Sequence, residues 1–222
     1  MKRVAISFVV LTLVTVLYTT CYADPHRAKQ GKSYLLTFKY GLPLKGHIYI
    51  QEIEDLIERG IIAKYGREEF EASILTHELH GHIGVYTLIG TKMGLYAMGL
   101  LSAPRRKMKI VSECGGGKYP LKCINDGIVV STLCSPIYGR LEIDSSKSNY
   151  AAAFSYGDKT VRLELKQSYR SQLEARIDDA VKKYKKEGKF TPPYWEQVRK
   201  MTWWAWEEWD RKIIFDVQWI RR

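Results

Sequence analysis

Three of the five histidines in this 222-residue chain lie within six residues, at His77, His80 and His82. Imidazole nitrogen is a common zinc ligand, so this cluster raises the question of a metal centre. The zinc-protease motif H-E-x-x-H does not explain it. That motif needs two histidines four residues apart, and the residue four after His77 is Gly81.

The glycine between His80 and His82 favours a different arrangement. Glycine adopts backbone angles that are closed to other residues, so the chain can turn sharply at Gly81 and direct both rings into one cavity. Two imidazoles near cysteine thiols form a donor set suited to zinc or another transition metal. A hydrogen-bonded surface turn is the alternative that the spacing leaves open.

The cysteines supply the second group of candidate ligands. Beyond the first residues the chain holds three, Cys114, Cys123 and Cys134. In an oxidising compartment an odd number leaves at least one thiol unpaired, which points to a metal, an intermolecular disulfide or a reactive thiol. Cys123 and Cys134 stand close to three helical turns apart, so on one helix they would share a face, with Asp126 beside them. Burial as structural cysteines is the alternative.

The elements that would position these residues are mainly helical. Hydrophobic spacing predicts helices over 50–59, 67–79, 83–101, 123–134 and 171–186, and a last helix after Pro192-Pro193. The segment 83–101 carries four glycines, which is typical of a buried helix packed closely on another element. Lys92 in its middle argues against a membrane span.

Strand patterns are interspersed with these helices. They cover 33–38, 108–113, 150–156 and 160–166, and the last two flank the turn signal Gly157-Asp158. Because there is no regular β-α-β alternation, the predicted class is α+β, with an antiparallel sheet and packed helices.

The first residues have the pattern of an export signal. Met1-Lys2-Arg3 is a short basic start, and an apolar run of signal-peptide length follows. We predict cleavage after Ala23 and export to a periplasmic or extracellular location. An N-terminal membrane anchor is the alternative, although the run is slightly short for a span.

Charge limits the choice of partner. Cleavage would remove Lys2 and Arg3 and lower the net charge from +11 to +9, which is still basic. Basic clusters such as 182–186 usually form a solvated helix face. An exported chain is not expected to meet nucleic acid, so an anionic membrane surface or polymer is the partner that the charge would favour.

Several blocks together resemble a known family. The stretch HGHIGVYTLIGTKMG, residues 80–94, is similar to the opening motif HGH-L-C-P-G and the glycine-bearing helix of the FmdE family, which is named for formylmethanofuran dehydrogenase. Glu113, Cys123, the DGI sequence from Asp126 and the TLC sequence ending at Cys134 resemble the second block of that family. The resemblance covers roughly residues 70–186.

The resemblance implies an α+β core, commonly a homodimer, with a His/Cys cluster that can hold a metal such as zinc. Carried over to this sequence, the metal ligands are His80, His82, Cys123 and Cys134. Asp126 would orient a ligand histidine or bond a helix-end amide.

The chain also departs from the family motif. Gly84 stands where the motif has cysteine, and Val85 where it has proline. Cys114 lies in an additional loop and could fill the vacant position or pair with Cys123. Formylmethanofuran chemistry needs a large cytoplasmic assembly with a pterin-bound metal, so we do not carry that activity over to a basic exported chain.

The tail beyond this resemblance contains all six tryptophans, between Pro192 and Arg222. Trp195, Trp206 and Trp209 follow helical spacing with other apolar residues. We predict an aromatic helix packed on the core or across a dimer. A membrane-interface helix is the alternative.

These inferences divide the chain into a signal peptide (1–23), an N-terminal extension (24–66), an FmdE-like metal-binding domain (67–190) and a C-terminal aromatic helix (191–222). The predicted function is an exported domain that binds a transition metal, preferably zinc. Two alternatives stay open. One is a metal-dependent enzyme in which Gly84 leaves a coordination position free. The other is a structural partner protein with a degenerate site.

Overall fold

The computed structural model describes residues 41–44, 48–117, 120–186 and 189–221. The predicted signal peptide (1–23) and the predicted strand over 33–38 lie outside the described residues. The chain divides into two compact units, Met1–Pro43 and Leu44–Arg222. The described helices and strands all belong to the second unit.

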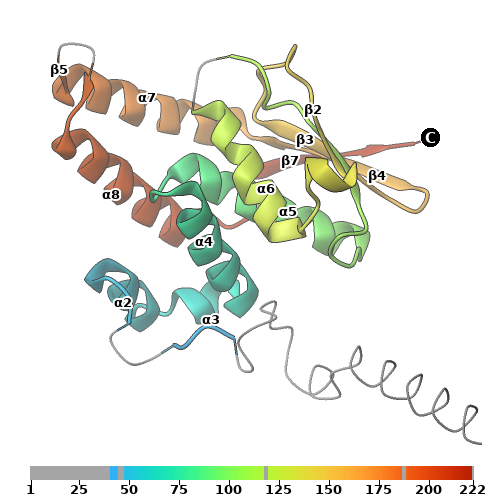
Figure 1. The fold of residues 1–222 in the computed structure, drawn as a ribbon, viewed down its shortest axis with the longest axis horizontal. Helices are drawn as coiled ribbons and strands as arrows, with labels where there is room; N and C mark the ends of the chain where they lie inside the picture. The colour runs from blue at the N-terminus through green and yellow to red at the C-terminus, as the bar shows by residue number, and fades with distance from the viewer. Residues whose placement is uncertain (1–40, 45–47, 118–119, 187–188, 222) are drawn as a thin grey trace, which may run out of the picture. The chain divides into compact units, whose positions relative to one another are not determined.

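Seven helices are present in the described residues (Figure 1): α2 (Gln51–Glu58), α3 (Ile61–Tyr65), α4 (Arg67–His80), α5 (Val85–Leu101), α6 (Ile124–Thr132), α7 (Gln167–Tyr184) and α8 (Pro192–Glu208). The longer strands are β1 (Lys109–Ser112), β2 (Leu141–Ile143), β3 (Ala151–Tyr156), β4 (Lys159–Leu165) and β7 (Phe215–Ile220). A two-stranded ribbon, β5 (Lys185–Lys186) and β6 (Lys189–Phe190), joins α7 to α8.

The five longer strands form one sheet in the order β2-β1-β3-β4-β7. Only the pair of β1 and β2 is parallel, and the other neighbours are antiparallel. The hairpin of β3 and β4 turns at Gly157, whose φ of 61° is left-handed. The α+β class with a mostly antiparallel sheet and packed helices is therefore confirmed.

Helix α5 is the centre of the core. Leu88, Ile89 and Met93 are fully buried, and the helix contacts β3, β4, α4 and α6. A Cβ atom on Gly90 would lie 1.9 Å from the carbonyl oxygen of Ile124 in α6. The backbones of the two helices therefore meet without side chains between them, as the glycine pattern predicts. None of the described helices combines the length and the apolar character that a membrane crossing requires.

The C-terminal segment differs from the predicted helix over 191–222. Helix α8 ends at Glu208, and residues from Phe215 form β7, which pairs with β4. Phe215, Val217 and Trp219 alternate along this strand, which is the periodicity of a sheet and not of a helix. The helical spacing of the tryptophans in α8 is the stronger pattern, so the short strand pattern of β7 was included in the predicted helix.

Packing of the aromatic helix on the core is confirmed. Trp203, Trp206 and Trp209 are buried, and Trp206 stacks on Phe70 of α4 at 6.1 Å between ring centroids. Trp195, at the start of the same stripe, is 43% exposed.

The predicted helix over 123–134 is also shorter in the structure. Leu133 has a left-handed φ of 55° and ends α6 after Thr132. Cys123 is the residue before the helix, and Cys134 lies beyond its end. The argument that both thiols share one helix face is therefore wrong.

Candidate metal centre

The last turn of α4 and the turn that follows it bring two histidines together. Gly81 has a left-handed φ of 78°, and its N–H donates to the carbonyl of His77 at 3.0 Å. The chain reverses there, so the rings of His80 and His82 lie 4.3 Å apart between centroids. This is the sharp turn that the glycine between them predicts.

His80 is oriented by a carboxylate from another helix. Its Nδ1 lies 2.6 Å from Oδ2 of Asp126, in the first turn of α6. The other ring nitrogen, Nε2, is buried and has no hydrogen-bond partner. A carboxylate on one nitrogen and a free second nitrogen is the arrangement that metal-binding histidines commonly have.

His82 lies at the mouth of this cluster. Although His82 as a whole is exposed, one side of its ring meets the edge of Trp195 in α8, 5.1 Å away between centroids. Burial, and then the neighbouring His80, lower the pKa of His82. A neutral imidazole is the form that binds a metal.

His77 is a member of the cluster that the sequence reasoning passed over. It is one turn before His80 on α4 and only 5% exposed, and its ring lies edge-on to Trp203 and Trp206. Neither ring nitrogen has a hydrogen bond of normal geometry. Burial lowers the pKa of His77 to about 3. The Gly84 backbone, close enough to the ring for a hydrogen bond of poor geometry, opposes this shift, and His80 and then His82 add to it.

A signal for His77 was present in the sequence. Residues three apart on a helix lie on the same face, so a helix ending near residue 80 places His77 beside His80. The protease motif relates His77 to the residue four positions later, whereas its neighbour His80 stands three positions later.

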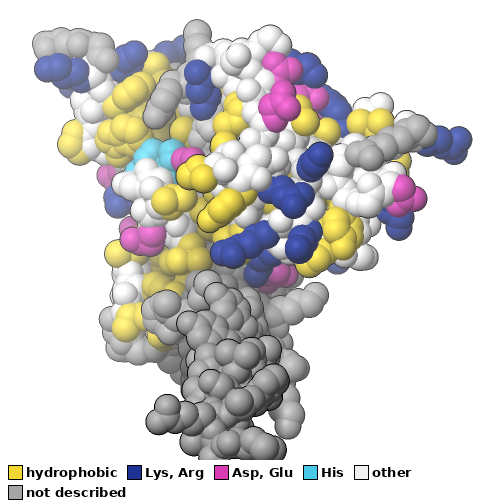
Figure 2. Space-filling view, turned by 45° about the vertical axis from the view of Figure 1, so that its right-hand side comes forward, with side chains coloured by type: hydrophobic (Ala, Val, Ile, Leu, Met, Phe, Trp, Pro, Cys, Tyr) yellow, Lys and Arg dark blue, Asp and Glu magenta, His cyan; other side chains and the backbone are white. Residues whose placement is uncertain are grey.

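A cavity of about 620 Å³ opens beside the histidines. Its walls come from the end of α4, the turn after it and the first turns of α8, and they include His77, Glu78, His82, Trp195 and Arg199. Figure 2 shows histidine side chains at the surface, bordered by hydrophobic and acidic side chains. The volume is in the range of small-ligand sites.

Of the three described cysteines, all free thiols, only Cys123 is placed near the histidine partner Asp126. Burial, and then the charge of Asp126, raise the pKa of Cys123 to about 11. Cys134 is buried elsewhere in the core, where its thiol donates to the carbonyl of Met108 at 3.5 Å. The structure does not bring this thiol into the histidine cluster.

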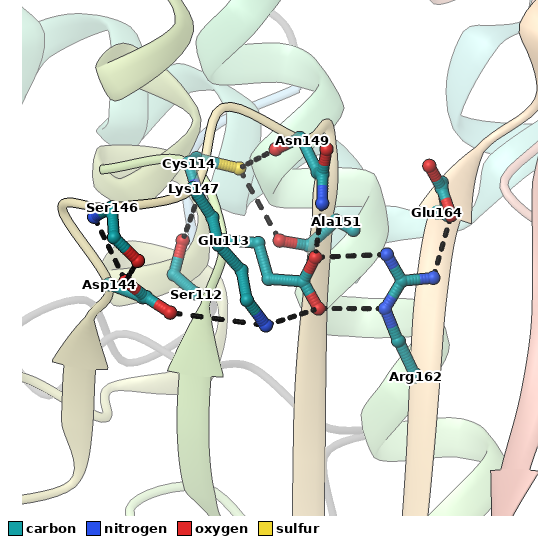
Figure 3. A network of polar contacts seen from close by, with 10 residues as sticks. All are labelled: Ser112, Glu113, Cys114, Asp144, Ser146, Lys147, Asn149, Ala151, Arg162 and Glu164. Carbon is teal, nitrogen blue, oxygen red and sulfur yellow. Dashed lines mark hydrogen bonds and ion pairs between the residues drawn. The ribbon is translucent and has the colours of Figure 1, made fainter. Parts of the chain in front are cut away.

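Cys114 lies at the end of β1 in a separate polar network (Figure 3). Its thiol donates to the carbonyls of Asn149 and Ala151 at 3.2 and 3.5 Å. Burial raises its pKa to about 11. These contacts describe a structural thiol and not a reactive one.

Glu113 is the centre of that network. Arg162 of β4 holds its carboxylate with two hydrogen bonds of 2.7 and 3.0 Å, and Asn149 donates a third at 2.6 Å. Hydrogen bonding to Arg162 is the main cause that lowers the pKa of Glu113 to about 2. The pair joins β1 to β4 across β3, so its role is to fix the sheet.

We expect Glu113→Gln to lower the free energy of unfolding by about 2 to 3 kcal/mol at pH 7, because Arg162 loses its charged partner. The folded-state pKa of Glu113 is depressed below its unfolded value of about 4.3. The stabilisation is therefore complete above that value and is lost as the pH falls toward 2. Urea unfolding between pH 7 and 3 measures the difference, which should shrink below about pH 4.

Glu164→Gln is the matched control, because this carboxylate contacts the other side of Arg162 but is 40% exposed. It should cost less than about 1 kcal/mol. Equal costs for the two variants would contradict the assignment of Glu113 as the main partner.

The imidazoles of the histidine cluster and the thiol of Cys123 suit zinc, because imidazole and thiolate are its usual ligands. Buried nitrogens without partners on His77 and His80 are the groups that an ion would satisfy. In the described residues, however, no three His, Cys, Asp or Glu side chains are arranged to hold a metal as they stand. Binding would need a third donor to turn toward the two imidazoles.

Comparison with known proteins gives one family. The sequence model described as FmdE, Molybdenum formylmethanofuran dehydrogenase operon, matches residues 79–213. No curated protein matches the chain. The matched span begins in the last turn of α4 and contains both His80 and Cys123, whereas His77 and β7 lie outside it.

Proposed function

Since the chain belongs to the FmdE family, we propose that it is a metal-binding protein that holds zinc or another transition metal through His80, His82 and Cys123. The observation that carries the proposal is the state of the His80 ring. Asp126 fixes one nitrogen at 2.6 Å, and the other is buried without a partner. An ion at this nitrogen would remove the cost of burying it unbonded.

In this proposal Asp126, Gly81 and Cys123 have different roles at the site. Asp126 accepts the proton on Nδ1 of His80 and so leaves Nε2 as the atom that binds. The turn at Gly81 keeps His82 next to it. Cys123 is protonated in the buried site, so a metal would displace its proton on binding, and affinity would rise with pH. Cys134 is not part of the proposal, because its hydrogen bonds lie in the core.

The cavity favours a second candidate function, a metal-dependent enzyme. It adjoins His82 and is large enough for a small substrate. A metal with three protein ligands would keep one position for water or substrate, as hydrolytic metal sites require.

The parts of the hypothesis that concern location and assembly rest on the sequence. Export through residues 1–23, a homodimer and contact of the basic, tryptophan-rich C-terminal segment with an anionic or membrane surface are proposals of that kind. An N-terminal anchor instead of export is the alternative for residues 1–23, which lie outside the described part of the chain.

The metal proposal predicts about one zinc per chain in protein purified without a metal-affinity tag. His80→Ala and Cys123→Ser should each lose the zinc, because each removes a ligand. Elemental analysis of the purified proteins measures the ratio, and far-ultraviolet circular dichroism shows whether the variants are folded.

Cys134→Ala is the control in this series. It removes a thiol of similar burial that points into the core, so the zinc ratio should stay unchanged. Absence of stoichiometric metal in the parent, after incubation with zinc and desalting, would overturn the proposal. Loss of zinc from the Cys134→Ala variant alone would show that the metal binds in the core near Cys134 and not at the histidines.

A further inference from the structure

His77 poses a problem for a purely structural interpretation. Both its ring nitrogens are buried without a hydrogen bond of normal geometry, although the Gly84 backbone lies close to the ring, and the ring stands among Trp203 and Trp206 in the core. A phenylalanine or leucine would fill such a position without burying polar atoms. An unsatisfied polar group in a folded protein calls for an ion, a water molecule or another specific role.

The surroundings of His77 connect it to the proposed ligands. It precedes His80 by one turn on the same helix face, and it lines the cavity together with His82. The Gly84 backbone lies within hydrogen-bonding reach of its ring. A Cβ atom added to Gly84 would stand 3.3 Å from Nε2 of His82, so Gly84 adjoins both rings.

From these contacts we infer that His77 is a further protein ligand of the metal, and that it binds beside Gly84 together with His80 and His82. The inference rests on the proposed metal site and extends it by one residue. The family match begins at residue 79 and so does not assign His77 a role. In the described residues the three rings do not form a ligand group as they stand. The inference therefore requires His77 and His82 to turn toward the ion as it binds.

If His77, His80, His82 and Cys123 all bind, the zinc has its usual four ligands and no position for substrate. The site would then store, carry or respond to a metal, and the enzyme alternative would lose its open position. The number of protein ligands therefore decides between the two candidate functions.

The first test is His77→Phe, which keeps an aromatic ring against Trp203 and Trp206 but removes both nitrogens. We expect zinc affinity, measured by competition with a coloured chelator, to fall by about 100-fold or more, since loss of an outer hydrogen-bond partner alone costs 10- to 100-fold. The Tm of the zinc-free variant should rise, because the buried unbonded nitrogens are gone. A residue with only a structural role would show a lower Tm and unchanged affinity.

The second test is rescue. In the His77→Phe background, Gly84→Cys places a thiol next to His82, at a position with an ordinary φ of −136°. Zinc affinity should recover. Cobalt(II) in place of zinc should then show a stronger sulfur-to-cobalt absorption band in the near ultraviolet than in the parent.

The outcomes separate this inference from the proposed function. If His80→Ala abolishes zinc binding and His77→Phe leaves the affinity within about threefold of the parent, His77 is not a ligand and the metal site stands. If neither the parent nor any variant binds zinc, the proposed function fails as well. Partial loss in His77→Phe without rescue by Gly84→Cys would also overturn the inference, since the position beside Gly84 would not be a ligand position.

Discussion

Gly127→Ala is expected to lower the free energy of unfolding by about 3 kcal/mol or more, because α6 crosses α5 at this residue without room for a side chain. An added Cβ would lie 2.1 Å from the carbonyl oxygen of Thr87 and 2.4 Å from the amide nitrogen of Thr91. Both neighbours are backbone atoms of a buried stretch of helix, so they cannot move aside alone. Alanine's advantage in helix propensity, about 1 kcal/mol, is much smaller than this overlap cost.

Gly99→Ala is the matched control in α5. This glycine is exposed, a Cβ there would meet nothing within 4 Å, and its φ is not left-handed. The same substitution should therefore stabilise the protein by about 0.5 to 1 kcal/mol. Urea unfolding followed by circular dichroism measures both variants. A Gly127→Ala protein as stable as the parent would show that the two helices are not packed backbone to backbone.

Glu69→Gln has the largest expected effect among the charged residues. Glu69 of α4 and Lys92 of α5 are both fully buried, and Glu69 Oε1 lies 2.5 Å from the lysine Nζ. Arg211, after α8, bonds the other carboxylate oxygen and the carbonyl of Tyr65. Removal of the negative charge leaves Lys92 buried without its anion, at a cost of about 3 to 5 kcal/mol at pH 7.

The pH dependence identifies the cause of this loss. Burial lowers the pKa of Lys92 below its usual value, so without Glu69 its charge opposes folding. The loss of stability should shrink as the pH rises through the unfolded-state pKa of about 10.4, because above that value the lysine is neutral in both states. The double variant Glu69→Leu with Lys92→Met should recover most of the stability, since an apolar pair carries no buried charge. A loss that is independent of pH and persists in the double variant would contradict this role of Glu69.

Much of the fold follows from local signals in the sequence. Gly60, Gly81 and Gly157 each take left-handed backbone angles at the end of an element, which is why the boundaries of α2, α4 and the β3–β4 hairpin were predictable. The glycines of α5 likewise indicated a close helix crossing. These features depend on single residues and their neighbours along the chain.

Other features depend on contacts between distant residues and were missed. β7 forms because Phe215–Ile220 completes the edge of β4, and the tryptophans before it carry a stronger helical pattern. The end of α6 at Leu133 has no glycine to signal it. Cys134 was therefore expected inside the helix, but it lies beyond the helix end. A left-handed leucine requires tertiary contacts that the sequence does not display.

In the candidate site, too, some features follow from local sequence and others depend on contacts between distant residues. The turn that joins His80 to His82 was predictable from Gly81, and Asp126 was expected to orient a histidine. The helical spacing of His77 and His80 places both on one face, but only the structure shows that the nitrogens of His77 are buried without a hydrogen bond of normal geometry. An unsatisfied buried atom is a property of the structure alone.

The central claim is that imidazoles of the α4 turn hold a metal together with Cys123. Zinc K-edge X-ray absorption of the zinc-loaded protein tests it most directly. We expect a first shell mainly of nitrogen at about 2.0 to 2.1 Å with a single sulfur at about 2.3 Å. Weaker outer scattering from the imidazole rings should accompany it and should diminish in His77→Phe. A shell of sulfur alone, or of oxygen alone without imidazole scattering, would contradict a site built on His80 and Cys123.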